Sequence, residues 1–287
     1  MLFILLGVSP SIGAWIAKIL SGEKHFLSFL RPLEVFIYRA AGIHETEEMN
    51  WKQYATAILV FSGICFTVVF LIQISQALLP LNPQGLPAVS WHLAINTAVS
   101  FMTNTNWQAY GGEATMSYFT QMLALTVQNF VSAATGIAVL VALARGIRQR
   151  ENHDLGNFWV DITRSTLYLL LPLSLVLAIL LVGEGVVQNF APYVSAKTIE
   201  GGSQLLPMGP AASQIAIKQL GTNGGGFFGV NSAHPFENPT PLSNFLQMLA
   251  ILLIPAAIPI AFGRLVKNMK HGYSVFAVMF GLFIIVL

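Results

Sequence analysis

Two short peptides carry the residue types in this sequence that could coordinate an ion. They are Thr103-Asn104-Thr105-Asn106-Trp107-Gln108 and Thr222-Asn223-Gly224-Gly225-Gly226-Phe227, and their first residues are 119 positions apart. Asn and Gly reach backbone conformations that turn carbonyl groups toward a common centre, and threonine hydroxyls add further oxygens. Because neither peptide contains a carboxylate, the pattern predicts a cage of neutral oxygens for a weakly hydrated monovalent cation.

Each peptide follows an apolar segment that is too short to cross a bilayer. The segments are Val89–Ser100 and Ala212–Leu220, whereas a spanning helix needs about 20 apolar residues. Twelve helical residues rise about 18 Å and therefore end near the middle of a hydrocarbon layer about 30 Å thick. The partial negative charge at such a helix end favours a cation just beyond it. We expect two pore loops whose carbonyl groups replace the water around a cation.

The same peptides also read as ordinary turns, because Thr, Asn and Gly are common turn residues. Two copies in matching places of the chain favour the ion site. Gly224-Gly225-Gly226 allows the backbone to approach a narrow axis, and the Thr105 hydroxyl can ligate an ion or brace the loop.

The composition is that of a membrane protein. Hydrophobic residues make up 55% of the chain and charged residues 9%, whereas a soluble domain carries roughly 25% charged residues. No Asp, Glu, Lys or Arg occurs in the 60 positions between Lys52 and Glu113. We therefore expect an all-α polytopic membrane protein that does not bind nucleic acid, because the sequence has no basic patch with interleaved aromatic residues.

The apolar runs predict six spans, with a retained first helix and an interfacial helical segment at Glu23–Asn50. The predicted spans are Leu2–Leu20, Tyr54–Leu79, Tyr118–Leu143, Ser165–Val182, Asn244–Phe262 and a sixth that begins near Tyr273.

Lys and Arg are distributed unevenly over the loops that these spans define. One side holds Lys18, Lys24, Arg31, Arg39, Lys52, Arg145, Arg148, Arg150, Arg164, Arg264, Lys267 and Lys270. The other side holds Lys197 and Lys218. Since basic loops stay in the cytoplasm, we expect both Thr-Asn loops to open toward the outside. Lys and Arg collect on one side in this way only if the two half-length segments do not cross the membrane.

The order span, half-helix, Thr-Asn loop, span therefore occurs twice. We expect an N-terminal span and cytoplasmic interfacial segment at 1–52, a first repeat at 53–145, a second repeat at 146–265 and the start of a third at 266–287. Because the sequence ends inside an apolar run, we expect a chain truncated after about two of four repeats.

Longer strings around the two peptides resemble one family. Tyr110-Gly111-Gly112-Glu113 and the run from Thr222 to Pro241, TNGGGFFGVNSAHPFENPTP, are similar to the two filter loops of the potassium-binding A subunit of the bacterial Kdp potassium-transporting ATPase. The resemblance extends over the whole chain, and it implies a fold like that of potassium channels, with four repeats around one filter. It implies filter oxygens from Asn104, Thr105, Asn106, Thr222, Asn223 and Gly224. It places Gln108 on the ion path, with Thr103, Gly225, Gly226, Glu113 and Glu237 as further filter or vestibule residues.

The resemblance also implies partners and a location. K⁺ is the transported ion, with no organic cofactor in this chain. In the bacterial plasma membrane, the family protein works with three others: a B subunit, which is a P-type pump that hydrolyses ATP, a C subunit and a small F subunit. The chain itself has no P-loop pattern, so we expect a protein without its own ATPase activity.

Two other functions remain open from the sequence. A Trk/Ktr-like passive or ion-coupled K⁺ transporter shares the repeat. A membrane-embedded enzyme would use Glu113, His234 and Glu237, although no converging pairs of carboxylates or histidines occur within the predicted spans. Glu113 and Glu237 could attract cations in a vestibule or could brace loop amides.

Overall fold

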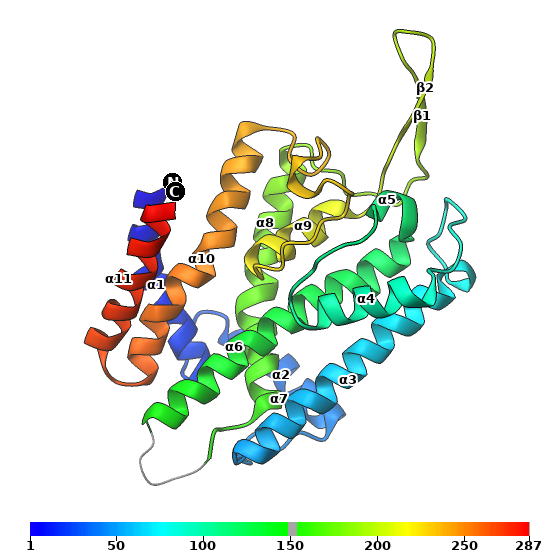
Figure 1. The fold of residues 1–287 in the computed structure, drawn as a ribbon. Helices are drawn as coiled ribbons and strands as arrows, with labels where there is room; N and C mark the ends of the chain where they lie inside the picture. The colour runs from blue at the N-terminus through cyan, green and yellow to red at the C-terminus, as the bar shows by residue number, and fades with distance from the viewer. Residues whose placement is uncertain (149–153, 287) are drawn as a thin grey trace. The chain divides into compact units, whose positions relative to one another are not determined.

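The computed structural model describes residues 1–148 and 154–286, and the described residues are mainly helical (Figure 1). Arg150 of the predicted basic loop and Leu287 of the last predicted segment lie outside the described residues. The chain divides into two compact units, each assembled from separate stretches of sequence. The first unit comprises 1–61, 133–172 and 249–287, and the second comprises 62–132 and 173–248.

Six helices among the described residues are long and apolar enough to cross a membrane, which confirms the predicted number of spans. Three of them are single helices: α1 (Leu2–Leu20), α10 (Pro241–Leu265) and α11 (Met269–Val286). The second span, Trp51–Leu78, consists of α3 (Trp51–Ser75) and η2 (Gln76–Leu78), and the third, Thr120–Arg148, consists of η3 (Thr120–Thr126) and α6 (Val127–Arg148). The fourth, Phe158–Gly183, consists of α7 (Phe158–Arg164), η4 (Ser165–Leu170) and α8 (Leu171–Gly183). The shorter elements are η1 (Ser28–Leu30), α2 (Arg31–Ala41), α4 (Trp91–Met102), α5 (Gly112–Thr115), β1 (Val194–Lys197), β2 (Ser203–Leu206), α9 (Ala211–Leu220) and η5 (Asn231–Ala233).

Both predicted half-length helices are present as α4, with 12 residues, and α9, with 10. Helix α4 begins two residues later than predicted. Val89 donates its N–H to the Gln73 carbonyl at 3.1 Å and not to a carbonyl of the helix, and Ser90 is the residue that precedes the helix. Both short helices end directly before a Thr-Asn loop.

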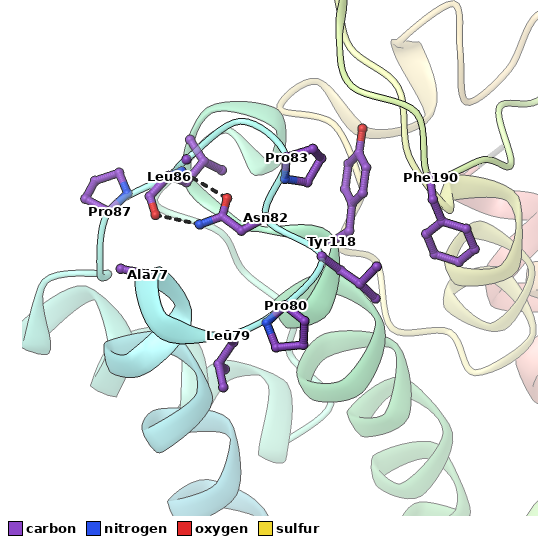
Figure 2. Close-up of a pocket in the computed structure, with 11 residues that line it drawn as sticks. Ala77, Leu79, Pro80, Asn82, Pro83, Leu86, Pro87, Tyr118 and Phe190 are labelled. Carbon is purple, nitrogen blue, oxygen red and sulfur yellow. Dashed lines mark hydrogen bonds between the residues drawn. The ribbon is translucent and has the colours of Figure 1, made fainter.

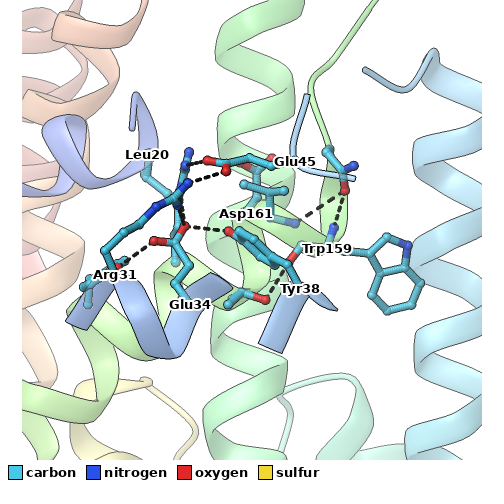
Figure 3. A network of polar contacts seen from close by, with 12 residues as sticks. Leu20, Arg31, Glu34, Tyr38, Glu45, Trp159 and Asp161 are labelled. Carbon is cyan, nitrogen blue, oxygen red and sulfur yellow. Dashed lines mark hydrogen bonds and ion pairs between the residues drawn. The ribbon is translucent and has the colours of Figure 1, made fainter. Parts of the chain in front are cut away.

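The fourth span begins well before the predicted Ser165, at Phe158. The Asn157 side chain caps this helix by accepting the Trp159 N–H at 3.0 Å. Asp161 is fully buried and accepts two hydrogen bonds from the Arg145 guanidinium, at 2.5 and 2.8 Å (Figure 3). Because Arg145 balances its charge, Asp161 can lie inside a helix, in a part of the sequence where the charged residues alone predict a loop.

The segment around Lys197, for which the sequence predicts no helix or strand, forms a two-stranded antiparallel hairpin. Strands β1 and β2 pair Val194 with Leu206 and Lys197 with Ser203, and the hairpin projects from the helices of the second unit (Figure 1). Most of its side chains are exposed on both faces. The sequence therefore lacks the alternation of buried and exposed residues by which strands are recognised.

A shallow pocket of about 520 Å³ lies on the second unit, beside the proline-rich loop that follows α3 (Figure 2). The Asn82 side chain closes this loop by bonding both backbone groups of Leu86, at 2.8 and 2.9 Å. Tyr118 and Phe190 form the other wall, and the Tyr118 hydroxyl donates to the Ala191 carbonyl at 2.7 Å. These bonds fix the segment before the hairpin against the start of the third span.

A polar cluster holds α2 within the first unit (Figure 3). The buried Glu34 carboxylate accepts hydrogen bonds from Tyr38 at 2.7 Å and Tyr168 at 2.6 Å. It also forms ion pairs with Arg164 at 2.9 Å and Arg31 at 2.7 Å. Four donors on one carboxylate give the predicted interfacial segment a fixed attachment to the fourth span.

We expect the stability of the chain to fall at acid pH because of Glu34. Burial opposes ionisation of this carboxyl, but the hydrogen bonds from its tyrosine and arginine partners outweigh burial and lower the pKa of Glu34 to about 2. A carboxyl with a lowered pKa stabilises the fold fully above its unfolded pKa of about 4.3, and this contribution is lost as the pH falls toward the folded value. Thermal unfolding of the purified chain in detergent, measured over this pH window, tests the expectation.

The matched variants are Glu34→Gln and Glu23→Gln. Glu34→Gln should lower stability at neutral pH and flatten its dependence on pH, whereas the exposed Glu23 should contribute nothing measurable. An unchanged acid slope in Glu34→Gln would contradict this explanation.

Candidate ion-binding site

The two Thr-Asn loops share an alternating backbone. The φ angles of Asn104 and Asn106 are +60° and +53°, and those of Thr222 and Gly224 are +53° and +89°. The residue between each pair is not left-handed. Alternation of right- and left-handed residues turns successive N–H groups to one side of the chain, and the carbonyl groups to the other. All of these residues belong to the second unit.

Most N–H groups at the start of the two loops are bonded to the ends of the short helices. Thr105 and Asn106 donate to the Ser100 carbonyl at 2.9 and 3.0 Å, and Asn223 donates to the Lys218 carbonyl at 3.0 Å. Within the described part of the chain, no hydrogen bond reaches the six carbonyl groups of the predicted filter residues. Thr105, Thr222 and Gly224 are exposed, so the loops offer a row of unoccupied carbonyl oxygens.

The structure shows which residues of the two loops correspond. The repeated letters Thr-Asn match Thr103 with Thr222, 119 positions apart. The helix ends match Thr103 with Gly221 instead, since each donates its N–H to the carbonyl four residues earlier. The matching distance is therefore 118, which pairs Asn104 with Thr222. Backbone conformation and not residue identity sets the correspondence.

Only one of the three consecutive glycines faces open space. A Cβ atom on Gly224 would meet nothing within 4 Å. A Cβ on Gly225 would lie 3.1 Å from the Asn106 Cβ, and a Cβ on Gly226 would lie 2.1 Å from the Asn231 Oδ1. Gly225 and Gly226 therefore allow close packing behind the loops, and Gly224 is the glycine on their open side.

Side-chain amides join the two loops to each other. Asn104 donates to the Gly221 carbonyl at 3.2 Å, and its Oδ1 accepts hydrogen bonds from the Asn223 amide and, at 2.8 Å, from the Ser132 hydroxyl. Asn106 donates to the Asn129 side chain at 2.5 Å. One face of α6 thus supports both loops.

Asn129 and Ser132 were not singled out from the sequence. Both are buried, and they are polar residues three positions apart inside a span. This is the signal that could have found them, because polar side chains within a span usually face the protein interior and serve a function.

Two buried amide oxygens at the loops have no hydrogen-bond donor among the described residues. They are the Oδ1 atoms of Asn106 and Asn223, whose residues are each 2% exposed. A buried acceptor without a donor costs about 1–3 kcal/mol. Each loop therefore carries a buried polar oxygen that no protein donor among the described residues satisfies.

Gln108 ties the first loop to the second by reciprocal hydrogen bonds. Its amide donates to the Gly226 carbonyl at 2.9 Å, and its Oε1 accepts the Gly226 N–H at 3.0 Å. The same amide lies 3.1 Å from the Tyr110 hydroxyl. The residue expected on the ion path thus also sets the distance between the two loops.

If the two loops form the K⁺ site that the resemblance implies, replacing Gln108 with Met should weaken K⁺ binding roughly tenfold, since each lost hydrogen bond contributes about 0.5–1.5 kcal/mol. The control is Gln84→Met. Gln84 is also half-buried and also bonds a tyrosine, Tyr118 at 3.2 Å, but it lies in the proline-rich loop. The apparent KM for K⁺ uptake, corrected for protein in the membrane, distinguishes the variants. Equal values for both would show that the bridge is unimportant.

The C-terminal end of the second loop is held by the third span. The Gln121 side chain donates to the Phe227 carbonyl at 3.0 Å, and Gln214 of α9 donates to the Gln121 carbonyl at 3.1 Å. Gln121 lies in the π-helical turn η3. A π-helical turn shifts the backbone hydrogen-bonding pattern of a helix. The Gln121 carbonyl in this turn accepts its hydrogen bond from the Gln214 side chain.

Both glutamates that were considered for a vestibule bond loop amides. Glu113 accepts the Gly229 N–H at 2.6 Å. Glu237 is fully buried, accepts the Phe228 N–H at 2.9 Å and forms an ion pair with Lys218. For Glu237 this geometry favours bracing over a vestibule role.

His234 packs within the same loop. Its ring stacks on Phe228 with centroids 4.2 Å apart, and its Nδ1 accepts the Phe236 N–H at 3.1 Å. Burial lowers the pKa of His234 below its ordinary value, against the opposing charges of Glu113 and Glu237. These contacts are those of a packed loop residue and give no support to the enzyme alternative.

The comparisons with known proteins all identify the same family. The family model described as "KdpA: Potassium-transporting ATPase A subunit" matches residues 1–287. A protein of Pseudomonas syringae pv. tomato described as the potassium-binding subunit of a potassium-transporting ATPase is 58% identical over 99% of the chain and 50% of its own length.

Proteins of the same description from more distant bacteria match equally completely. The relative from Sorangium cellulosum is 57% identical over 100% of the chain and 51% of its own length. The relative from Clostridium perfringens is 55% identical over the same shares. The chain therefore spans about half the length of the curated relatives it matches.

Proposed function

We propose, because the chain belongs to the KdpA family of potassium-transporting ATPase A subunits, that it binds K⁺ at its two Thr-Asn loops and passes the ion inward. The observation that carries this proposal is the division of hydrogen bonds in the loops. The N–H groups of five of the six predicted filter residues, all except Gly224, bond to carbonyls of the short helices, whereas the carbonyls of the six residues accept no hydrogen bond among the described residues. Free carbonyl oxygens at close spacing can replace the hydration shell of K⁺.

The proposed ligands are the two triplets with alternating backbone. In the first loop they are Asn104, Thr105 and Asn106, and in the second they are Thr222, Asn223 and Gly224. Helices α4 and α9 end at these triplets, so the negative ends of two helix dipoles face the ion. No carboxylate takes part, which suits a monovalent cation better than a divalent one.

The chain contributes part of a larger filter in this proposal. Two loops supply two sides of a cage, and the relatives are about twice as long as the chain. We infer that two further loops complete the ring of oxygens. We also infer that a P-type pump, the B subunit of the complex, supplies the energy together with the C and F subunits.

Growth at low K⁺ tests the proposal. A bacterial strain without high-affinity K⁺ uptake would express the chain together with a Kdp pump partner, with and without the C-terminal half of a relative. Rescue that needs both halves is expected. Rescue by the chain alone would mean that two loops suffice. If the chain reaches the membrane and no combination rescues growth, the proposal is wrong and the passive Trk/Ktr-like mechanism takes its place.

We further propose that the loops face the outside of the bacterial plasma membrane. The basis is the excess of Lys and Arg on the opposite side. The prediction is that Lys197→Cys, in the exposed hairpin, reacts with an impermeant thiol reagent on intact cells. Lys270→Cys, exposed at the start of α11, should react only after the cells are opened. Both variants need a Cys65→Ser background, and the reverse labelling pattern would overturn the orientation.

A further inference from the structure

A buried ion pair lies beside the second loop, and among the described residues no ion pair lies beside the first. Lys218 of α9 is 2% exposed and Glu237 is fully buried, and their charged groups are in direct contact. The position that corresponds to Lys218 in the first loop, 118 residues earlier, is Ser100, which donates its hydroxyl to the Trp107 carbonyl at 3.0 Å. Since a serine suffices in one loop, the chain conformation itself does not require an ion pair.

A buried ion pair is a poor means of gaining stability. Removing two charges from water costs about as much as their attraction returns, and a well-packed apolar pair often replaces them without loss. The role of the pair therefore lies in what it holds in place.

Lys218 and Glu237 between them hold both ends of the loop 223–228. The Lys218 carbonyl accepts the N–H of the proposed ligand Asn223 at 3.0 Å. The Glu237 carboxylate accepts the Phe228 N–H at 2.9 Å through one oxygen and binds the Lys218 ammonium through the other. The ion pair thus closes a ring around the segment that contains the filter residues.

Glu237 is itself fixed from a third direction. Gln247 of α10 donates to the Glu237 carbonyl at 2.8 Å, and Gln219 of α9 donates to the Gln247 side chain at 2.9 Å. The backbone of the residue that anchors Phe228 is therefore held in place as well.

The two charges of the pair also affect the binding of a cation at the end of α9. An ammonium group one turn before the end of α9 would repel a cation at the helix end, and the Glu237 carboxylate offsets that repulsion. Removal of the carboxylate alone should therefore be more harmful to cation binding than removal of the ammonium alone.

We infer that Lys218 and Glu237 are positioning residues that fix the second filter loop and thereby set the affinity and selectivity of the K⁺ site. The inference rests on the proposed function. Groups that orient ion ligands typically change affinity about 10- to 100-fold when they are lost. The maximum uptake rate should change less than the apparent KM, because the pair contacts the loop and not the ion path beyond it.

The test uses the chain in the combination that rescues growth, with its partners present. The variants are Lys218→Met, Glu237→Gln and the double variant, and the control is Lys197→Met, which removes an exposed lysine from the hairpin. The readouts are the apparent KM for K⁺, inhibition of uptake by Na⁺, and the amount of each variant in the membrane. Failure of the wild-type chain to rescue would refute the proposed function instead of this inference.

The expected result is a rise in KM of about 10- to 100-fold with stronger inhibition by Na⁺, greatest in Glu237→Gln, and no change in Lys197→Met. The double variant leaves no unpaired charge, so it should reach the membrane even if the single variants unfold, and its KM should remain raised. Wild-type KM and Na⁺ inhibition in the double variant would show that the pair is only structural.

Hydrogen exchange provides a second measurement that does not depend on transport. Amides in 222–228 of the purified double variant should exchange faster than in the wild type, while those in 104–108 should not change. Equal exchange in 222–228 would overturn the inference.

Discussion

Replacing Gly112 with Ala is expected to abolish K⁺ uptake at low K⁺. A Cβ on Gly112 would lie 2.0 Å from the Phe227 carbonyl oxygen and 2.7 Å from the Gln121 amide nitrogen. The oxygen belongs to the backbone and the amide is bonded to it, so neither can move without displacing the second loop. Overpacking of this kind costs about 1–3 kcal/mol, and here the strain falls directly on the end of the proposed filter.

The adjacent glycine provides the control. A Cβ on Gly111 would have its nearest neighbour, the Glu113 Oε2, at 3.6 Å, which is an ordinary contact. Gly111→Ala should therefore retain uptake close to that of the wild type. Growth rescue at low K⁺ and the level of protein in the membrane distinguish the two variants. If Gly112→Ala rescued growth as well as Gly111→Ala, the packing of α5 against the second loop would not matter for transport.

Replacing Gly224 with Ala is expected to raise the apparent KM for K⁺ by roughly 5- to 30-fold. Its Cβ would meet open space, so the cost arises from the backbone, whose φ is +89°. A left-handed alanine costs about 1–2 kcal/mol, which corresponds to that range of affinity. Relaxation of the strain would turn the Gly224 carbonyl away from the ion.

Gly224→Asn separates backbone conformation from side-chain size. Asn tolerates the left-handed region, and Asn106 occupies the corresponding place in the first loop with φ +53°. The larger Asn side chain should therefore be tolerated better than Ala, whereas a steric explanation predicts the opposite order. Gly224→Asp adds a negative charge, and we expect it to reduce discrimination against Na⁺ and ammonium. The apparent KM for K⁺ and inhibition by both cations test these expectations.

The local features of this protein could be read from its sequence. The six spans and the two half-length helices follow from the presence and the length of apolar runs, which can be recognised without knowledge of the tertiary structure. The predicted ends differ from the structure where charge is balanced over a long sequence distance, as at Asp161 and Arg145, or where a cap such as Asn157 extends a helix. The hairpin at β1 and β2 escaped prediction because neither of its faces is buried.

The sequence by itself determined that two Thr-Asn loops follow two half-length helices, because turn-forming residues and interrupted apolar runs are local properties. Only the tertiary structure decided how the loops correspond and what holds them. The spacing of 118, the Gln108–Gly226 bridge and the support from Asn129 and Ser132 depend on hydrogen bonds between residues far apart in the chain. The Lys218–Glu237 pair could also not be predicted from the sequence. A charged residue in a loop or short helix is expected to be exposed unless the tertiary structure places an oppositely charged partner beside it.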